Sequence, residues 1–320
     1  MFVLLTGAKG FIGSQLLARL CASGHKVRVV TRTSFETSFS DVEVVLADLT
    51  NPETNYDSLV SGCEVVFNCA GEIRDEKAMR SLHVDATGRL IAAVNRQASA
   101  EHPIHFVQLS SVGAYGPAQG ALRIVSETTK ENPQGTYEET KTIADSLVMK
   151  GGSSEFFSYS ILRPSNVFGA SMTNNSLRQL GKIVQKGLFF YIGTARRDAV
   201  ATYVHVEDVA SALMLCGFHP LARGEVFNLS NDCPLSDLIN GMADAQHVSR
   251  PKWSVSETLL RVMVTVANRF LRLPVTPARI DALVSKTTYP TTKIRDTLGF
   301  VPEKNVPEAI SELFTKRPIV

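Results

Sequence analysis

Short runs of β-branched and other apolar residues alternate with longer amphipathic segments through the first half of the chain. The runs are bounded by Gly, Asn or Asp, and they predict buried strands at 2–6, 26–30, 42–46, 64–68, 105–110 and 158–162. Between them, apolar residues recur with the period of a helix in 12–23, 81–100 and 137–150. Short strands that alternate with helices are typical of a parallel sheet covered on both faces. The pattern therefore predicts an α/β fold with a doubly wound parallel sheet.

The pattern changes after Pro164, where turns rich in Gly and Asn separate isolated helices. We interpret this part as a smaller domain that covers the carboxyl edge of the sheet, where such folds bind ligands. The expected division is a sheet domain of residues 1–167 plus 202–229 and a smaller, substrate-binding domain of 168–201 plus 230–320.

Composition narrows the class of protein. The chain has 320 residues, of which 44% are hydrophobic and 20% charged, with 33 Lys and Arg against 31 Asp and Glu. This composition is ordinary for a globular protein, and a net charge of +2 offers no field for gripping nucleic acid. Five cysteines without regular spacing do not predict a disulfide framework, so we expect reduced thiols and a cytoplasmic protein.

Two apolar segments, 2–5 and 259–271, bear on whether the chain has a signal peptide or a membrane span. The apolar run at 2–5 is too short for a signal peptide and leads directly into a glycine-rich turn. The most apolar later stretch, 259–271, is interrupted by Arg261 and Arg269 and is shorter than a membrane span. We expect a buried or half-buried helix there. The alternative is a membrane-surface helix that turns Arg261, Arg269 and Arg272 toward lipid head groups.

A glycine-rich loop follows the first strand and opens a helix. Residues 6–13 read Thr-Gly-Ala-Lys-Gly-Phe-Ile-Gly. Gly7 permits a tight turn, Gly10 lets a pyrophosphate approach the backbone, and Gly13 allows the helix to pack on the strand. The phosphates would then lie on the N–H groups of the helix N-terminus. The loop predicts a dinucleotide site that includes Lys9, Phe11 and Ile12, and a plain βα turn is the alternative.

The end of the second strand bears on which dinucleotide is bound. The segment 29–34 contains Arg32 with hydroxyl residues beside it and no acid. A carboxylate there would bond the ribose hydroxyls of NAD, whereas Arg32 suits the 2′-phosphate of NADP. NADP is favoured, NAD is possible, and Arg32 could also simply face solvent. Asp48 with Leu49 closes the third strand, where a carboxylate could accept from the adenine amino group.

A candidate acid–base group lies on the helix at 137–150. Tyr137 and Lys141 are one helical turn apart, and the ammonium is expected to lower the pKa of the phenol toward 7. The pair could then exchange the proton of a hydroxyl/carbonyl couple. Taken alone, such a pair is more often a solvated helix face. The hydroxyl-rich strand end at 109–116, which includes Ser111, can reach the same substrate oxygen and favours the catalytic reading.

Together these residues resemble the extended, epimerase-like branch of the short-chain dehydrogenase/reductase superfamily, over nearly the whole chain. The loop 6–13, Tyr137-x-x-x-Lys141, the serine motif at 110–116 and the segments 162–169, 203–210, 224–229 and 298–302 carry the resemblance. It implies a Rossmann-type NAD(P)-binding domain, with Tyr137, Lys141 and Ser111 catalytic. It further implies cofactor contacts from Cys69, Ala70, Gly71 and Pro164, a diphosphate contact from Asn166, and a homodimer.

Departures from the family pattern bear on the reaction. Val112 and Gly113 stand where family dehydratases place an acid–base pair. Ala201 replaces a diphosphate-gripping arginine, with Arg196 and Arg197 upstream as possible substitutes. Ile73 stands where many epimerases carry a Lys, and His83 where an Asn is usual.

These features leave several functions open. The leading hypothesis is an NADP-linked oxidoreductase that reduces a 4-keto nucleotide-activated sugar, and the runner-up is a nucleotide-sugar 4-epimerase. A reductase of steroid- or flavonoid-like ketones and a protein that only senses the dinucleotide are further alternatives. The spacings of Cys63 with Cys69 and of His102 with His105 do not match zinc sites, so no metal is expected. His205 is expected to pack within an apolar strand.

Overall fold

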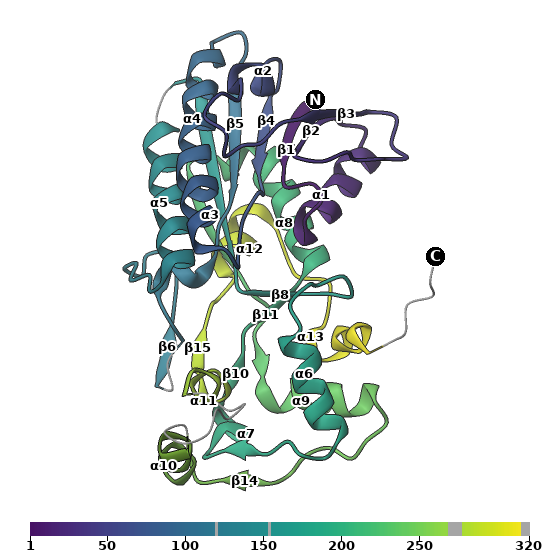
Figure 1. Cartoon of the computed structure of the whole chain (residues 1–320), viewed down its shortest axis with the longest axis vertical. Coiled ribbons are helices and arrows are strands. Elements are labelled where there is room, and N and C mark those ends of the chain that lie inside the picture. The colour runs from purple at the N-terminus through teal and green to yellow at the C-terminus, as the bar shows by residue number, and fades with distance from the viewer. Residues whose placement is uncertain (119–120, 153–154, 268–276, 315–320) are drawn as a thin grey trace.

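The computed structural model describes residues 1–118, 121–152, 155–267 and 277–314 (Figure 1). Its centre is a seven-stranded sheet in the order β12-β7-β5-β4-β1-β2-β3, with every neighbouring pair parallel. These strands are β1 (Phe2–Thr6), β2 (Lys26–Thr31), β3 (Val42–Leu46), β4 (Val65–Asn68), β5 (Ile104–Leu109), β7 (Phe157–Pro164) and β12 (Glu225–Leu229). The strand order reverses between β1 and β4, which is where a doubly wound sheet opens a ligand crevice.

Helices cover both faces of the sheet, as the alternating pattern predicts. On one face, α1 (Phe11–Ala22) packs against α8 (Val206–Phe218), and both contribute to a core with β1 and β5. On the other face, α4 (Ala86–Gln97) packs against α5 (Thr136–Gly151), which lie together to the left of the sheet in Figure 1. The predicted α/β, doubly wound Rossmann-type fold is confirmed.

The sequence pattern missed two features. The seventh strand, β12, returns to the sheet from the glycine-rich second half of the chain. The helix expected at 81–100 begins with a π-helical turn η1 (Ser81–Asp85), continues as α4 to Gln97, and is preceded by α3 (Glu76–Arg80), which was not expected. The backbone stays in the α region at Arg80, Asp85 and Ala86, so the π turn continues the helix into α4 without an interruption that the sequence would mark.

Below the carboxyl edge of the sheet, a second core forms among α6 (Ser176–Gln185), α9 (Leu235–Ala245), α10 (Glu257–Ala267) and α11 (Pro277–Val284) (Figure 1). We propose the two-domain division stated above on the basis of this separate core. The helix α12 (Thr292–Leu298) falls in the smaller domain of this division but packs with the sheet domain. Its Ile294 and Leu298 lie in the core on the α1/α8 face.

The remaining elements are short. They are α2 (Tyr56–Val60), η2 (Val112–Tyr115), β6 (Leu122–Ile124), β8 (Asn166–Phe168), β9 (Tyr191–Ile192), α7 (Ala195–Asp198), β10 (Val200–Ala201), β11 (Tyr203–His205), η3 (Pro220–Ala222), β13 (Cys233–Pro234), β14 (Ser254–Val255), β15 (Lys286–Thr288), α13 (Val306–Ala309) and η4 (Ile310–Leu313). Within the described ranges, no helix is long and apolar enough to cross a membrane. Arg269 and Arg272 lie outside the described residues, whereas α10 covers the first part of the apolar stretch.

Candidate functional site

The glycine loop leaves no room for side chains at two positions. Gly7 has a φ of +73°, and a β-carbon there would lie 2.7 Å from the Ala70 nitrogen. A β-carbon at Gly13 would lie 2.1 Å from the Gly7 carbonyl oxygen. Gly10 begins α1 without a side-chain cap, so the first-turn N–H groups of Phe11 and Ile12 are available to an anion.

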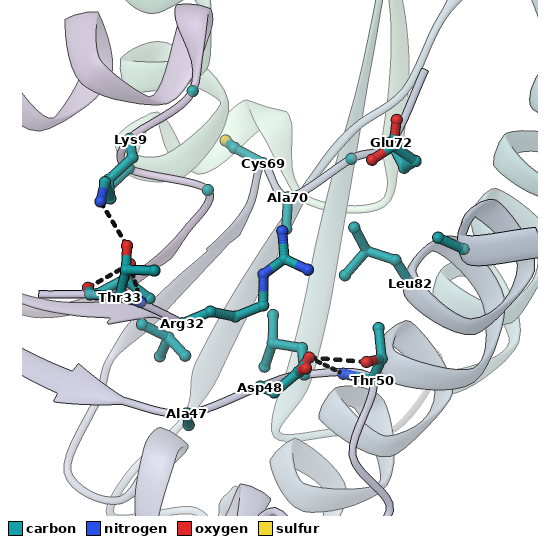
Figure 2. A pocket seen from close by; sticks show the side chains of 18 residues that line it. Lys9, Arg32, Thr33, Ala47, Asp48, Thr50, Cys69, Ala70, Glu72 and Leu82 are labelled. Carbon is teal, nitrogen blue, oxygen red and sulfur yellow. Dashed lines mark hydrogen bonds between the residues drawn. The ribbon is translucent and has the colours of Figure 1, made fainter. Parts of the chain in front are cut away.

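A cavity of about 330 Å³ opens where β1, β2, β3 and β4 end (Figure 2). It collects nine of the residues predicted to bind the cofactor, namely Gly7, Lys9, Gly10, Arg32, Asp48, Leu49, Cys69, Ala70 and Gly71. The glycine turn, the uncapped helix end and this cavity fit the phosphates and adenosine of a dinucleotide. Those assignments stay predictions, as do the contacts expected from Tyr137, Lys141 and Pro164, which do not line this cavity.

Arg32 lines the cavity instead of facing away from it. Figure 2 shows its guanidinium between Ala70 and Asp48. Nearby, Lys9 Nζ donates to Thr33 Oγ1 at 2.6 Å and to the Ser34 carbonyl at 3.2 Å. Two cations and a hydroxyl therefore stand at the end of β2, an arrangement suited to a phosphate.

Two carboxylates share the cavity with Arg32. Asp48 Oδ1 accepts from the Thr50 backbone N–H and hydroxyl, both at 2.8 Å, and these bonds, with a smaller contribution from Arg32, lower the pKa of Asp48. Glu72 Oε1 accepts from the backbone N–H groups of Ile73 and Arg74 at 2.8 and 2.7 Å, and these bonds, that of Arg74 foremost, lower its pKa. Glu72 was missed in the sequence, although it directly follows Ala70 and Gly71.

Tyr137 and Lys141 both lie on α5, but they do not have the expected electrostatic relation. Burial, followed by the carboxylates of Asp145 and Glu138, raises the pKa of Tyr137 to about 12. Lys141 is buried, and its Nζ donates to the Leu109 carbonyl. This rise is opposite in direction to the lowering that we expected from Lys141, and its causes are the burial of the phenol and the two carboxylates.

A buried charge network lies behind Lys141. Asp145 Oδ2 accepts from Ser110 Oγ at 2.7 Å and from Arg163 Nε at 2.9 Å, and Arg163 also pairs with Glu131. Burial raises the pKa of Asp145, and Arg163 and then Ser110 oppose that rise. The network joins α5 to the carboxyl ends of β5 and β7 and so fixes α5 against the sheet. The i, i+4 spacing of Lys141 and Asp145 was the available sequence signal.

The Ser111 hydroxyl accepts from the Gly113 backbone N–H at 3.1 Å and begins the short helix η2. A β-carbon on Gly113 would lie 3.0 Å from Glu138 Cγ and 3.3 Å from Ser111 Oγ. Glu138 therefore occupies the space beside the serine hydroxyl, and burial raises its pKa. The loop at 112–113 lacks carboxylates as the sequence indicates, but α5 supplies one to the same place.

His83 links the cavity to α5. Its Nε2 accepts from the Glu72 backbone N–H at 2.9 Å, so the Nδ1 hydrogen can be donated to Thr140 Oγ1, 2.9 Å away. The ring also lies edge-on to Tyr137, with 5.7 Å between centroids. Burial lowers the pKa of His83 to about 4, which keeps the imidazole neutral.

The predicted substrate residues are not gathered in one place. Asn166 begins β8 and donates through Nδ2 to the Thr202 carbonyl at 3.0 Å, with an exposed side chain. Arg196 and Arg197 lie on α7, near the lower end of the molecule and well away from β8 in Figure 1. Arg196 Nη1 approaches the Lys252 carbonyl at 3.5 Å. Because α7 and β8 are separate in that view, the expectation that these arginines assist Asn166 stays a prediction.

Other candidate ligands have structural roles. His205 caps α8 through Nδ1, which accepts from the Glu207 N–H at 3.3 Å, and its Nε2 lies 3.1 Å from Glu312 Oε2. Over the described ranges, no three His, Cys, Asp or Glu side chains gather as a metal site would require.

Comparisons with known proteins agree with this geometry. The model of a family described as the NAD dependent epimerase/dehydratase family matches residues 3–230. A UDP-glucose 4-epimerase of Vibrio cholerae is 22% identical over 97% of this chain and 93% of its own length. A 2-alkyl-3-oxoalkanoate reductase of Stenotrophomonas maltophilia is 24% identical over 98% of both. The structure of MoeE5 in complex with UDP-glucose and NAD has a TM-score of 0.73 at 23% identity, covering 98% of this chain and 97% of that one.

Proposed function

Because the chain belongs to the NAD-dependent epimerase/dehydratase family and is an enzyme of the extended short-chain dehydrogenase/reductase type, we propose that it reduces a 4-keto nucleotide-activated sugar with NADPH. The observation that carries this proposal is the end of β2. Arg32 stands there in the cavity with Lys9 and Thr33 beside it, and no acid occupies 29–34 to bond the ribose hydroxyls of NAD.

The residues of the site have distinct roles in this proposal. The glycine loop and Arg32 hold the dinucleotide, which when bound supplies the hydride. Tyr137 donates its phenolic proton to the ketone oxygen as the carbonyl carbon is reduced to a secondary alcohol, and solvent reprotonates the phenolate. A pKa of about 12 keeps this phenol protonated at neutral pH, the form that a reduction needs. Ser111 would orient the oxygen, and Lys141 would bind the nicotinamide ribose.

The substrate class rests on a weaker observation. The start of β8 places the amide of Asn166 beside the carboxyl edge of the sheet, and MoeE5, a structural neighbour, is recorded with UDP-glucose. A second candidate is a reductase of a hydrophobic ketone. The position of α7, which carries Arg196 and Arg197, away from β8 in Figure 1 favours it, as does the likeness to a 2-alkyl-3-oxoalkanoate reductase.

The test follows NADPH consumption by the purified full chain with three substrates: a nucleoside-diphospho-4-keto-6-deoxyhexose, a 2-alkyl-3-oxoalkanoate and UDP-glucose. Reduction of the 4-keto sugar, with Asn166→Ala raising its KM and sparing dinucleotide affinity, supports the proposal. Reduction of the oxoalkanoate alone selects the second candidate. Interconversion of UDP-glucose and UDP-galactose by protein that retains its dinucleotide through purification would instead identify a 4-epimerase and overturn both.

A further inference from the structure

The helix α10 has apolar residues on both of its sides. Its inner side buries Leu260 and Val264 in the lower core, where they are 8% and 3% exposed. A surface helix normally turns charged and polar residues outward. Instead, α10 turns outward an apolar stripe, 49–58% exposed and spaced i, i+3, i+4, i+7, which we call the outer stripe: Leu259, Val262, Met263 and Val266.

A further exposed apolar residue lies at the same end of the chain's fold. Trp253 is 81% exposed and directly precedes β14. Figure 1 shows α10 and β14 at the end of the molecule farthest from the central sheet. Tryptophan is favoured at boundaries between lipid and water, because its ring is apolar and its N–H is a hydrogen-bond donor. The outer stripe and Trp253 thus give the molecule an apolar tip.

The charge around this tip is unlike that of the rest of the chain. The described residues 250–267 and 277–286 contain five Lys and Arg and two Asp and Glu, a net charge of +3, and the rest of the sequence carries a net charge of −1. Three of these cations are in ion pairs: Arg250 with Asp244, Arg261 with Glu257 and Asp281, and Lys286 with Asp198. An apolar stripe within a basic segment is the pattern by which helices bind anionic bilayers from one side, because the cations lie against phosphates while the apolar side chains enter the acyl boundary.

We propose that this tip docks the enzyme on the surface of an anionic membrane. With 11 residues, α10 is about 16 Å long and cannot cross a hydrocarbon core of about 30 Å, so it lies along the surface. Docking through the tip turns the central sheet and the cavity at Arg32 away from the bilayer, and it does not depend on the substrate proposed above.

Flotation of the full chain with phospholipid vesicles tests the proposal. Vesicles of phosphatidylcholine are compared with vesicles in which about a third of the lipid is phosphatidylglycerol, at low and high salt. The test variant carries Val262→Gln with Met263→Gln. The matched control carries Leu221→Gln with Val301→Gln, which removes two apolar side chains of similar exposure, 60% and 61%, outside the tip.

Wild type and control are expected to float with the anionic vesicles and to be released by salt, and the test variant to bind about tenfold more weakly or worse. Dinucleotide affinity should be equal in all three proteins, since the substitutions are remote from the cavity. The proposal is overturned if wild type stays with the soluble fraction at low salt, or if the test variant floats as well as wild type. Sedimentation that shows a dimer lost in the test variant, or a Tm several degrees lower in that variant, would assign the outer stripe to a second copy or to this chain's own packing.

Discussion

Arg32 decides the cofactor in the proposed mechanism, and changing its charge tests that role. Arg32→Asp should reverse a preference for NADPH over NADH, because a charge-assisted phosphate bond worth about 1.5–3 kcal/mol, roughly ten- to a hundredfold in affinity, becomes a repulsion. Fluorescence titration with both dinucleotides measures it. Arg80→Asp removes the same charge from outside the cavity lining and should leave the preference unchanged. Equal affinity of wild type for the two dinucleotides would contradict the role of Arg32.

Tyr137 is the proposed proton donor. Tyr137→Phe keeps the ring and removes only the exchangeable proton, so turnover should fall by about 10²–10⁴ while dinucleotide affinity persists. Ser111→Ala should cost less, since it removes one hydrogen bond to the reacting oxygen. Steady-state kinetics on a reduced ketone, with dinucleotide titration as the folding control, checks both. Near-normal turnover of the Tyr137→Phe enzyme would leave the reaction without its acid.

At the scale of elements, the π turn η1 places His83 between the cavity residue Glu72 and Thr140 of α5. His83→Phe keeps an aromatic ring but breaks the link between the Glu72 N–H and the Thr140 hydroxyl. We expect kcat to fall by about two- to tenfold, the worth of one neutral hydrogen bond, with a smaller change in KM. His83→Gln offers an acceptor and a donor in one side chain and should recover most of kcat. A kcat unchanged in His83→Phe would show that this link does not position Tyr137.

His105 on β5 offers a separate test through pH. Burial lowers its pKa to about 4, and its ring nitrogens lie 2.8 Å from Ser158 Oγ and 2.9 Å from the Cys216 carbonyl oxygen. Between about pH 6.5 and 4, His105 binds a proton in the unfolded chain but not in the folded chain. The free energy of unfolding therefore decreases as the pH falls through this window, and His105 does not change it above the window.

The fall in Tm from about pH 7 to about pH 5 should therefore be smaller in His105→Gln than in wild type. The comparison between proteins is needed because Asp232, whose pKa burial raises to about 6, acts in the opposite direction. The control is His247→Asn, which removes an exposed imidazole far from β5 in the sequence. A Tm difference that does not change with pH would refute the shift at His105.

The sequence pattern predicted the elements that depend on residues close together in the chain. The strands β1 and β5 have β-branched or apolar runs, and the glycine loop has a spacing that its own packing requires. The π turn at 81–85 was not predicted, because the helical backbone continues through it into α4 and no residue marks the change of turn. Contacts between segments that are distant in the sequence, such as Glu138 with Gly113, were also not predicted, because neither segment contains a signal for the other. The arginines at 196 and 197 were assigned to the diphosphate by position in a pattern, and the path of α7 separates them from Asn166.

At the scale of the whole molecule, the uneven charge predicts how the protein behaves in chromatography. The sequence pI is 8.2, so an evenly charged protein of this kind would pass through a cation exchanger at a slightly higher pH. The described residues 250–267 and 277–286 carry a net charge of +3 toward one end of the molecule, and they should hold the protein on a sulfonate resin even when the net charge is slightly negative. Replacing Lys252 and Arg279 by Glu should abolish that retention, whereas the same change at Lys26 and Arg80 should only shift the salt at which the protein elutes. The resin would then bind the enzyme in a single orientation, with the tip against the resin and the cavity at Arg32 open to the mobile phase.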